Sequence, residues 1–172
     1  EAIPNHLDGI IIEGGSRYNV VRDNLISGNR LNGVRIDGIC TDVNWILHNS
    51  IGTDVDGSDP IGNGDDGVLI ENGAACNVVG GPTLPGAFAD LGDQADLGGL
   101  GGGNVISGNG QYGVHIVGGC ENLVQSNYIG LNSEGLSGLC NQVGVVIQNG
   151  GQGNIIGTGD SGDPARGNFI AG

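Results

Sequence analysis

An asparagine followed by apolar residues recurs along this chain at three phases of one repeat, and this recurrence limits the available folds. The segments "DGIIIEGG", "NGVRIDG", "DGVLIENG", "YGVHIVGG" and "VGVVIQNG" align on their glycine. The alignment then yields three asparagine columns, each filled five times: Asn19, Asn44, Asn77, Asn122 and Asn154; Asn24, Asn49, Asn104, Asn127 and Asn168; Asn5, Asn29, Asn63, Asn109 and Asn141. Internal repetition of this kind is typical of solenoids, in which each repeat stacks on the last.

Between the asparagines, aliphatic residues alternate with other residues over short segments, as in β-strands. Three such strands per repeat predict a chain that coils around a three-sided prism, with coils about 4.8 Å apart. The inward columns would be Val34, Val68, Val114 and Val145; Ile12, Ile36, Ile70, Ile116 and Ile147; Val21, Ile46, Val79, Val124 and Ile156; Ile26, Ile51, Ile106, Ile129 and Ile170. The predicted fold is therefore an all-β, right-handed parallel β-helix of about five coils, each with three short strands.

The repeat divides the chain into one domain, residues 1–172. Its predicted coils are 5–28, 29–62, 63–108, 109–140 and 141–172, with a long loop insertion at about 80–102. Three shorter insertions of nine residues fall at corners, after Asn49, Asn127 and Asn154. Asparagine suits such bends because it tolerates a left-handed backbone and its amide bonds to nearby backbone. Stacked amides can also bond along the ladder.

Composition supports strands and excludes several classes of partner. The chain has 38 glycines and only 3% aromatic residues, so a core must consist of Val, Ile and Leu, and helices are disfavoured. With a formal net charge of −14 and five basic residues, the chain has no basic cluster to neutralise phosphates, which argues against nucleic-acid binding. The same charge disfavours anionic membranes, and no apolar run has the length for membrane insertion.

The phrases "NVISGNG", "SNYIGLNSEG", "NSIGTDVDGSDPIGNG" and "NGAACNVVGG" resemble the repeats of pectate-lyase-like parallel β-helix proteins. They are similar in particular to repeat arrays of secreted and cell-surface proteins. The resemblance covers nearly the whole chain apart from the long loop. It implies the β-helix fold but leaves function open, because the family spans lyases, hydrolases, epimerases, adhesins and structural stalks.

One acidic loop, "TDVDGSDPIGNGDDG", suggests calcium, because Asp54, Asp56 and Asp59 place carboxylates at close spacing beside a glycine. The EF-hand pattern fails, since no glutamate stands at the twelfth position. The equivalent loop "LNSEGLSGLCN" retains only Asn132 and Glu134 as oxygen ligands. The simpler interpretation is an acidic turn. No cofactor is required by the sequence, and calcium is the one cofactor that it suggests.

The catalytic candidates are weak. "GDDG" at residues 64–67 is similar to the paired aspartates of polygalacturonases, but Asp66 occupies the repeat position held by Asp8, Asn32 and Tyr112 in other coils. On the outward face of the first wall, Arg35 stands beside Asp37 and between Glu13 and Glu71, the one place that could serve a lyase. The simpler interpretation is that Arg35 relieves repulsion among stacked carboxylates. His6, His48 and His115 fall at different strand positions, so we expect no catalytic residues.

Four cysteines show no CxxC spacing, which disfavours zinc. Cys40, Cys76 and Cys120 follow the first-wall strand in successive coils, so they share one predicted corner. The coil spacing permits one disulfide between neighbours, either Cys40–Cys76 or Cys76–Cys120. Cys140 belongs to another corner, and we expect it to be free or to pair with another molecule.

These features favour an extracellular or cell-surface module with a structural or interaction role. The ends Asn5, Asn168 and Ile170 would continue the coil in a second copy or in a longer array, so the main predicted partner is the chain itself, head to tail. Two alternatives remain: a polysaccharide-active enzyme fragment of lyase or epimerase type, and a non-catalytic module that binds surface glycans.

Overall fold

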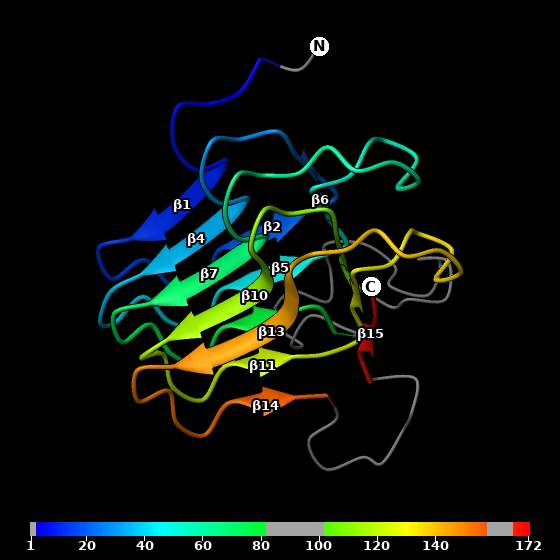
Figure 1. Cartoon of the computed structure of the whole chain (residues 1–172). Coiled ribbons are helices and arrows are strands. Elements are labelled where there is room, and N and C mark those ends of the chain that lie inside the picture. The colour runs from blue at the N-terminus through cyan, green and yellow to red at the C-terminus, as the bar shows by residue number, and fades with distance from the viewer. Residues whose placement is uncertain (1–2, 82–101, 158–166) are drawn as a thin grey trace.

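The computed structural model describes residues 3–81, 102–157 and 167–172, and it shows a parallel β-solenoid. The described residues contain fifteen strands and no helix. The strands form three parallel sheets of five strands each, and each sheet takes one strand from every coil (Figure 1). The predicted fold of about five coils with three short strands is confirmed.

Each sheet is one wall of the solenoid. The first sheet contains β1 (Ile10–Glu13), β4 (Val34–Asp37), β7 (Val68–Glu71), β10 (Tyr112–Val117) and β13 (Val143–Gln148). The second contains β2 (Val20–Arg22), β5 (Trp45–Leu47), β8 (Val78–Val79), β11 (Leu123–Val124) and β14 (Ile155–Ile156). The third contains β3 (Leu25–Ile26), β6 (Ser50–Ile51), β9 (Val105–Ile106), β12 (Tyr128–Ile129) and β15 (Phe169–Ile170).

The register of the sheets matches the predicted inward columns. Ile36, for example, lies between Ile12 and Ile70 in the first sheet. Twelve inward side chains of the three middle coils are completely buried: Val34, Ile36, Ile46, Ile51, Val68, Ile70, Val79, Ile106, Val114, Ile116, Val124 and Ile129. Each contributes about 1.5–3 kcal/mol through removal of its apolar surface from water. The core is therefore a continuous aliphatic stack along the solenoid axis.

The three asparagine columns form continuous amide ladders at the corners. Asn49 shows the pattern: its backbone N–H and its Nδ2 both donate to Oδ1 of Asn104 in the next coil, at 2.9 and 3.0 Å. Another Nδ2 bond of Asn49 reaches the carbonyl of Leu47 at 2.9 Å. Every ladder runs in the same direction, because the asparagine nearer the N-terminus donates to the one nearer the C-terminus.

The expectation that these asparagines adopt the left-handed conformation is wrong. None of the fifteen has a positive φ; instead, the residue before the asparagine is often left-handed, as at Tyr18, Val43 and Cys76 (φ 61°, 57° and 54°). Such a φ is unfavourable for a β-branched residue such as Val43. Turning the chain one residue early leaves the asparagine extended, so that its backbone N–H and its side chain both face the next coil.

Loop insertions leave the corners without disturbing the coil. Residues 53–60 and 131–138 each close with an antiparallel bridge, Thr53 to Pro60 and Leu131 to Gly138. Most of the predicted long insertion, at 82–101, and most of the third nine-residue insertion, at 158–166, lie outside the described residues.

Candidate functional site

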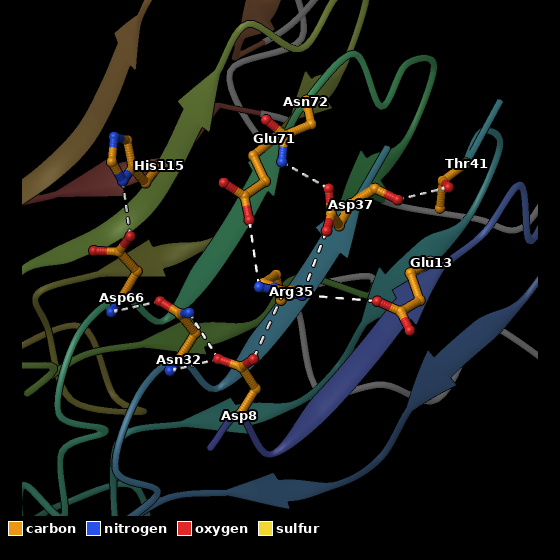
Figure 2. Close-up of polar contacts among 10 residues, drawn as sticks. All are labelled: Asp8, Glu13, Asn32, Arg35, Asp37, Thr41, Asp66, Glu71, Asn72 and His115. Carbon is orange, nitrogen blue, oxygen red and sulfur yellow. Dashed lines mark hydrogen bonds and ion pairs between the residues drawn. The ribbon is translucent and has the colours of Figure 1, made fainter. Parts of the chain in front are cut away.

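On the outward face of the first sheet, a cluster of charged residues surrounds Arg35. Arg35 lies on β4, and its guanidinium lies within 4 Å of four carboxylates (Figure 2). The distances are 3.7 Å to Asp8, 3.7 Å to Glu13, 3.4 Å to Asp37 and 3.6 Å to Glu71. The structure thus brings together Arg35 and the three acidic residues that the sequence placed beside it, and it adds Asp8.

Asp8 belongs to a fourth ladder, at a repeat position for which the sequence predicted no contact. Oδ1 of Asp8 accepts the backbone N–H and Nδ2 of Asn32, at 2.9 and 2.7 Å. The backbone N–H of Asp66 donates to Oδ1 of Asn32, and that of Tyr112 donates to Oδ1 of Asp66, both at 3.1 Å. In this ladder the residue nearer the C-terminus donates, which is the reverse of the asparagine ladders.

Two aspartates of this ladder each hold a basic residue on the next coil. Asp8 pairs with Arg35, and Oδ2 of Asp66 lies 2.8 Å from Nδ1 of His115 (Figure 2). In both cases the basic residue stands three positions after the residue that stacks on the aspartate. Asn32 stacks on Asp8 and is followed by Arg35, and Tyr112 stacks on Asp66 and is followed by His115. The Asp66–His115 contact was not predicted. The repeat alignment, read with this three-residue offset, is the signal that would have revealed it.

Both ring nitrogens of His115 are engaged. Nδ1 faces Asp66, and Nε2 lies 2.8 Å from Nε2 of Gln148 on β13. Each ring nitrogen of His115 thus has a polar partner within the protein, a carboxylate on one side and an amide on the other. The ring of Tyr112 packs edge-on against that of His115, with centroids 4.6 Å apart. Both ring nitrogens of His115 are therefore directed toward the protein's own side chains.

Burial changes the acidity of Asp66 and Glu71. Burial raises the pKa of Asp66, against the hydrogen bond from His115, which lowers it. Burial also raises the pKa of Glu71; nearby Asp37 raises it further, and Arg35 lowers it. The guanidinium of Arg35 holds the carboxylates of this cluster together. Because these side chains face one another, the arrangement favours a structural role for Arg35.

The acidic corner loop does not gather its aspartates as a metal site. Among the described residues, no three His, Cys, Asp or Glu side chains form a group that could hold a metal ion. Asp54 instead accepts the backbone N–H groups of Ser58 and Asp59, at 2.8 and 3.1 Å, and these bonds lower its pKa. In the equivalent loop, Asn132 accepts the N–H groups of Leu136 and Ser137 in the same way.

Because a neutral amide replaces Asp54 in the second loop, the turn needs an oxygen acceptor rather than a charge. The two loops also stack: Ser133 donates its N–H to the carbonyl of Gly57 and its hydroxyl to that of Asp56, both at 2.9 Å. Asp54 therefore functions as a turn cap, and the geometry gives the predicted calcium ligands Asp54, Asp56 and Asp59 no shared point of convergence.

All four cysteines are free thiols, and neither predicted disulfide is formed. The sequence placed Cys76 and Cys120 at one corner, but the two residues stand one and two positions before Asn77 and Asn122, and they do not pair directly. Ala75 pairs with Cys120, and the thiol of Cys76 faces the carboxylate of Glu121 at 3.6 Å. Burial, together with Glu121, raises the pKa of the Cys76 thiol.

A second Asp–His pair lies at another corner. Nδ1 of His48 contacts Oδ1 of Asp23, and both residues have positive φ. An open cavity of about 250 Å³ beside the pair is lined by Asp23, Asn24, Leu25, His48, Ser50 and Val55. As predicted, the histidines do not converge: His48 lies at a corner and His115 on β10.

The two ends of the described solenoid differ in exposure. Two inward residues of the first coil are nearly covered, Ile12 at 7% and Ile26 at 5% exposed, and Val21 is partly buried. Their counterparts in the last coil are open: Ile147 is 41%, Ile156 37% and Ile170 49% exposed. This apolar end surface is continuous with the core columns, which are completely buried one coil earlier.

Fold and surface together define a parallel β-solenoid with an aliphatic core, amide-laddered corners and one charged wall. Comparison with protein-family models, with curated proteins and with solved structures finds no match to this chain. The resemblance to pectate-lyase-like proteins therefore stays a prediction. Among the described residues, no helix combines the length and apolar character needed to cross a membrane.

Proposed function

We propose that this chain is a non-catalytic structural or interaction module, one stacked segment of an extracellular or cell-surface solenoid. The observation that carries the proposal is the open last coil. Ile147, Ile156 and Ile170 continue columns that are completely buried in the preceding coil, yet they are more than a third exposed. An apolar surface in register with the core is suited to receive another coil.

The polar groups support a structural role. Arg35 is surrounded by four carboxylates, and both ring nitrogens of His115 are occupied. A lyase or epimerase would need a base directed toward the substrate. In this cluster, the arginine and the histidine are directed toward the protein's own side chains.

Electron microscopy and sedimentation velocity at increasing protein concentration test the proposal. We expect rods that lengthen with concentration, with the coil axis along the rod. A uniform species of 17.2 kDa at every concentration would contradict it.

A second candidate function is glycan binding, favoured by the cavity beside Asp23 and His48. Hydroxyl groups of a sugar could bond to the carboxylate, the imidazole and the Ser50 side chain, which all line this cavity. A glycan-array signal that disappears in His48→Ala and persists in His115→Ala would support this role. A signal unchanged by His48→Ala would exclude the cavity as the binding site.

A further inference from the structure

We infer that two cavities beside His48 form one cleft, which binds a short run of an uncharged, linear oligosaccharide along the solenoid axis. This inference rests on the second candidate function, glycan binding, and names the class of glycan and its direction. Three features of the structure carry it: the shape of the cleft, its two open polar groups and the acidic loops beside it.

The cleft lies on the outward side of the third sheet, where the cavity beside Asp23 continues into a smaller one. This second cavity, of about 160 Å³, is lined by His48, Asn49, Ser50, Gly103, Val105 and Ser133. His48 and Ser50 line both cavities, so the two meet at these residues. Leu25, Ser50 and Val105 form the floor, because they are paired positions on β3, β6 and β9. Two strand spacings make this floor about 10 Å long, which is more than a single sugar ring occupies.

The stacked loops 53–60 and 131–138 form one wall of the cleft. Val55 of the first loop lines the larger cavity, and Ser133 of the second loop lines the smaller one. The second loop also lies against the sheet, since a Cβ added to Gly135 would be 3.1 Å from Cζ of Tyr128 on β12. Because its floor consists of outward side chains, the cleft does not depend on what stacks on either end of the solenoid.

Two polar groups are open where the cavities meet. Nδ1 of His48 contacts Oδ1 of Asp23, and Oδ2 of Asp23 lies 3.1 Å from Nε of Arg22. Asp23 thus fixes the imidazole ring and leaves its Nε2 for a ligand. In the described part of the chain, no residue bonds to this Nε2 or to the hydroxyl of Ser50. One imidazole nitrogen and one hydroxyl are therefore ready to bond to a ligand.

This lining suits a sugar chain better than a peptide. Leu25 and Val55, each more than half exposed, offer apolar surface next to His48 and Ser50. A sugar ring carries hydroxyl groups at its edge and C–H groups on its faces, so it satisfies both kinds of surface. A peptide would bring backbone N–H and C=O groups that need partners, and on the face of a sheet the backbone groups are already paired with neighbouring strands.

The charges beside the cleft disfavour acidic sugars. The two wall loops contain no Lys, Arg or His, and their acidic residues are Asp54, Asp56, Asp59 and Glu134. Arg22 already pairs with the carboxylate of Asp23. A uronate chain would bring further carboxylates next to these groups without a free cation to balance them. The cleft therefore favours an uncharged sugar.

The test is isothermal titration calorimetry with sugars of defined length and charge, at about 0.15 M salt. The uncharged probes are cellotriose, mannotriose and triacetylchitotriose, each with its dimer and monomer. The charged probes are trigalacturonate and the trimer of glucosamine. We expect at least one uncharged trimer to bind, at least about tenfold more tightly than its monomer and than trigalacturonate.

Four variants locate the sugar. His48→Ala and Ser50→Ala should each weaken binding of the trimer by about three- to tenfold, because each removes one hydrogen-bonding group. His6→Ala is the matched control, since His6 is exposed and does not line the cleft. Ser133→Tyr fills the smaller cavity, so the trimer should bind only as tightly as its monomer. Circular dichroism verifies that each variant is folded, and the comparison of trimer with monomer on wild type needs no variant.

Other outcomes separate this inference from glycan binding as a function. If the trimers bind no more tightly than their monomers, or if Ser133→Tyr leaves trimer binding unchanged, the extended cleft is wrong while binding at the His48 cavity stands. If a charged trimer binds more tightly than every uncharged one, the class of sugar is wrong. Binding unchanged by His48→Ala places the glycan on another surface and overturns the inference. If no uncharged trimer binds, the inference fails, whereas a glycan-array signal that depends on His48 would still support glycan binding.

Discussion

Removing one buried asparagine of a ladder should destabilise the protein far more than removing an asparagine at its end. The side chain of Asn104 is completely buried. Its Nδ2 donates to the carbonyl of Ile46 at 2.8 Å and to Oδ1 of Asn127 at 2.9 Å. Its Oδ1 accepts the backbone N–H and Nδ2 of Asn49, at 2.9 and 3.0 Å.

Asn104→Ala breaks these four hydrogen bonds and leaves their partners buried. At about 1 kcal/mol each, the loss is about 4 kcal/mol of unfolding free energy. A domain of this kind has about 5–15 kcal/mol in total, so the variant should be only marginally stable. Asn24→Ala in the same ladder is the matched control. It removes two donated bonds in a solvent-exposed setting, and we expect a loss of about 1 kcal/mol or less.

Urea unfolding measures both changes. The fluorescence of the single tryptophan, Trp45, which is 5% exposed, reports on the second coil, and circular dichroism reports on all sheets. Coincident transitions are needed before a single free energy is extracted. Equal losses for Asn104→Ala and Asn24→Ala would refute the conclusion that the ladders act through buried, mutually satisfied amides.

Three further predictions concern acidity, backbone strain and thiols. Folding raises the pKa of Glu71, so the stability that its protonated carboxyl contributes is full below the ordinary pKa of 4.5 and is lost as pH rises through the folded pKa. In unfolding experiments at increasing pH, Glu71→Gln should therefore gain stability relative to wild type across this range. A difference between the two proteins that does not change with pH would contradict this prediction. A Cβ added to Gly57 (φ 67°) would lie 2.7 Å from Cβ of Ser133, whereas a Cβ added to Gly14 (φ 68°) would meet open space. Gly57→Ala should therefore lower the free energy of unfolding by about 1–3 kcal/mol, and by more than Gly14→Ala does. In a Ser133→Gly background this excess should disappear. In a thiol titration, Cys76 should react more slowly than Cys40, which is likewise exposed, because the pKa of Cys76 is raised. Glu121→Gln should speed the reaction of Cys76. A Cys76–Cys120 disulfide in mass mapping would show that the pairing of Cys76 with Glu121 at this corner is wrong.

The sequence by itself determined the number of walls, the inward columns and the strand register. This was possible because each coil repeats the same residue type at the same position, and a one-residue slip would turn Ile36 or Ile70 outward. The amide ladders followed from the same repetition. The three acidic neighbours of Arg35 could be predicted too, since directly paired positions on adjacent strands lie side by side.

Only the tertiary structure decided which atoms meet at the corners. Corner segments differ in length, so the sequence could be aligned there either from the preceding strand or from the following asparagine, and the structure decided for the asparagine, which sets Cys76 against Glu121. The Asp66–His115 pair likewise depends on how far a side chain at a bend reaches along the next strand, and the repeat alignment identifies the partner only once that three-residue reach is known. The direction of the ladders was likewise decided by the tertiary structure, in which the asparagine nearer the N-terminus donates to the one in the next coil. Strand periodicity carries no information on these orientations, since it repeats along the strands and not through the bends.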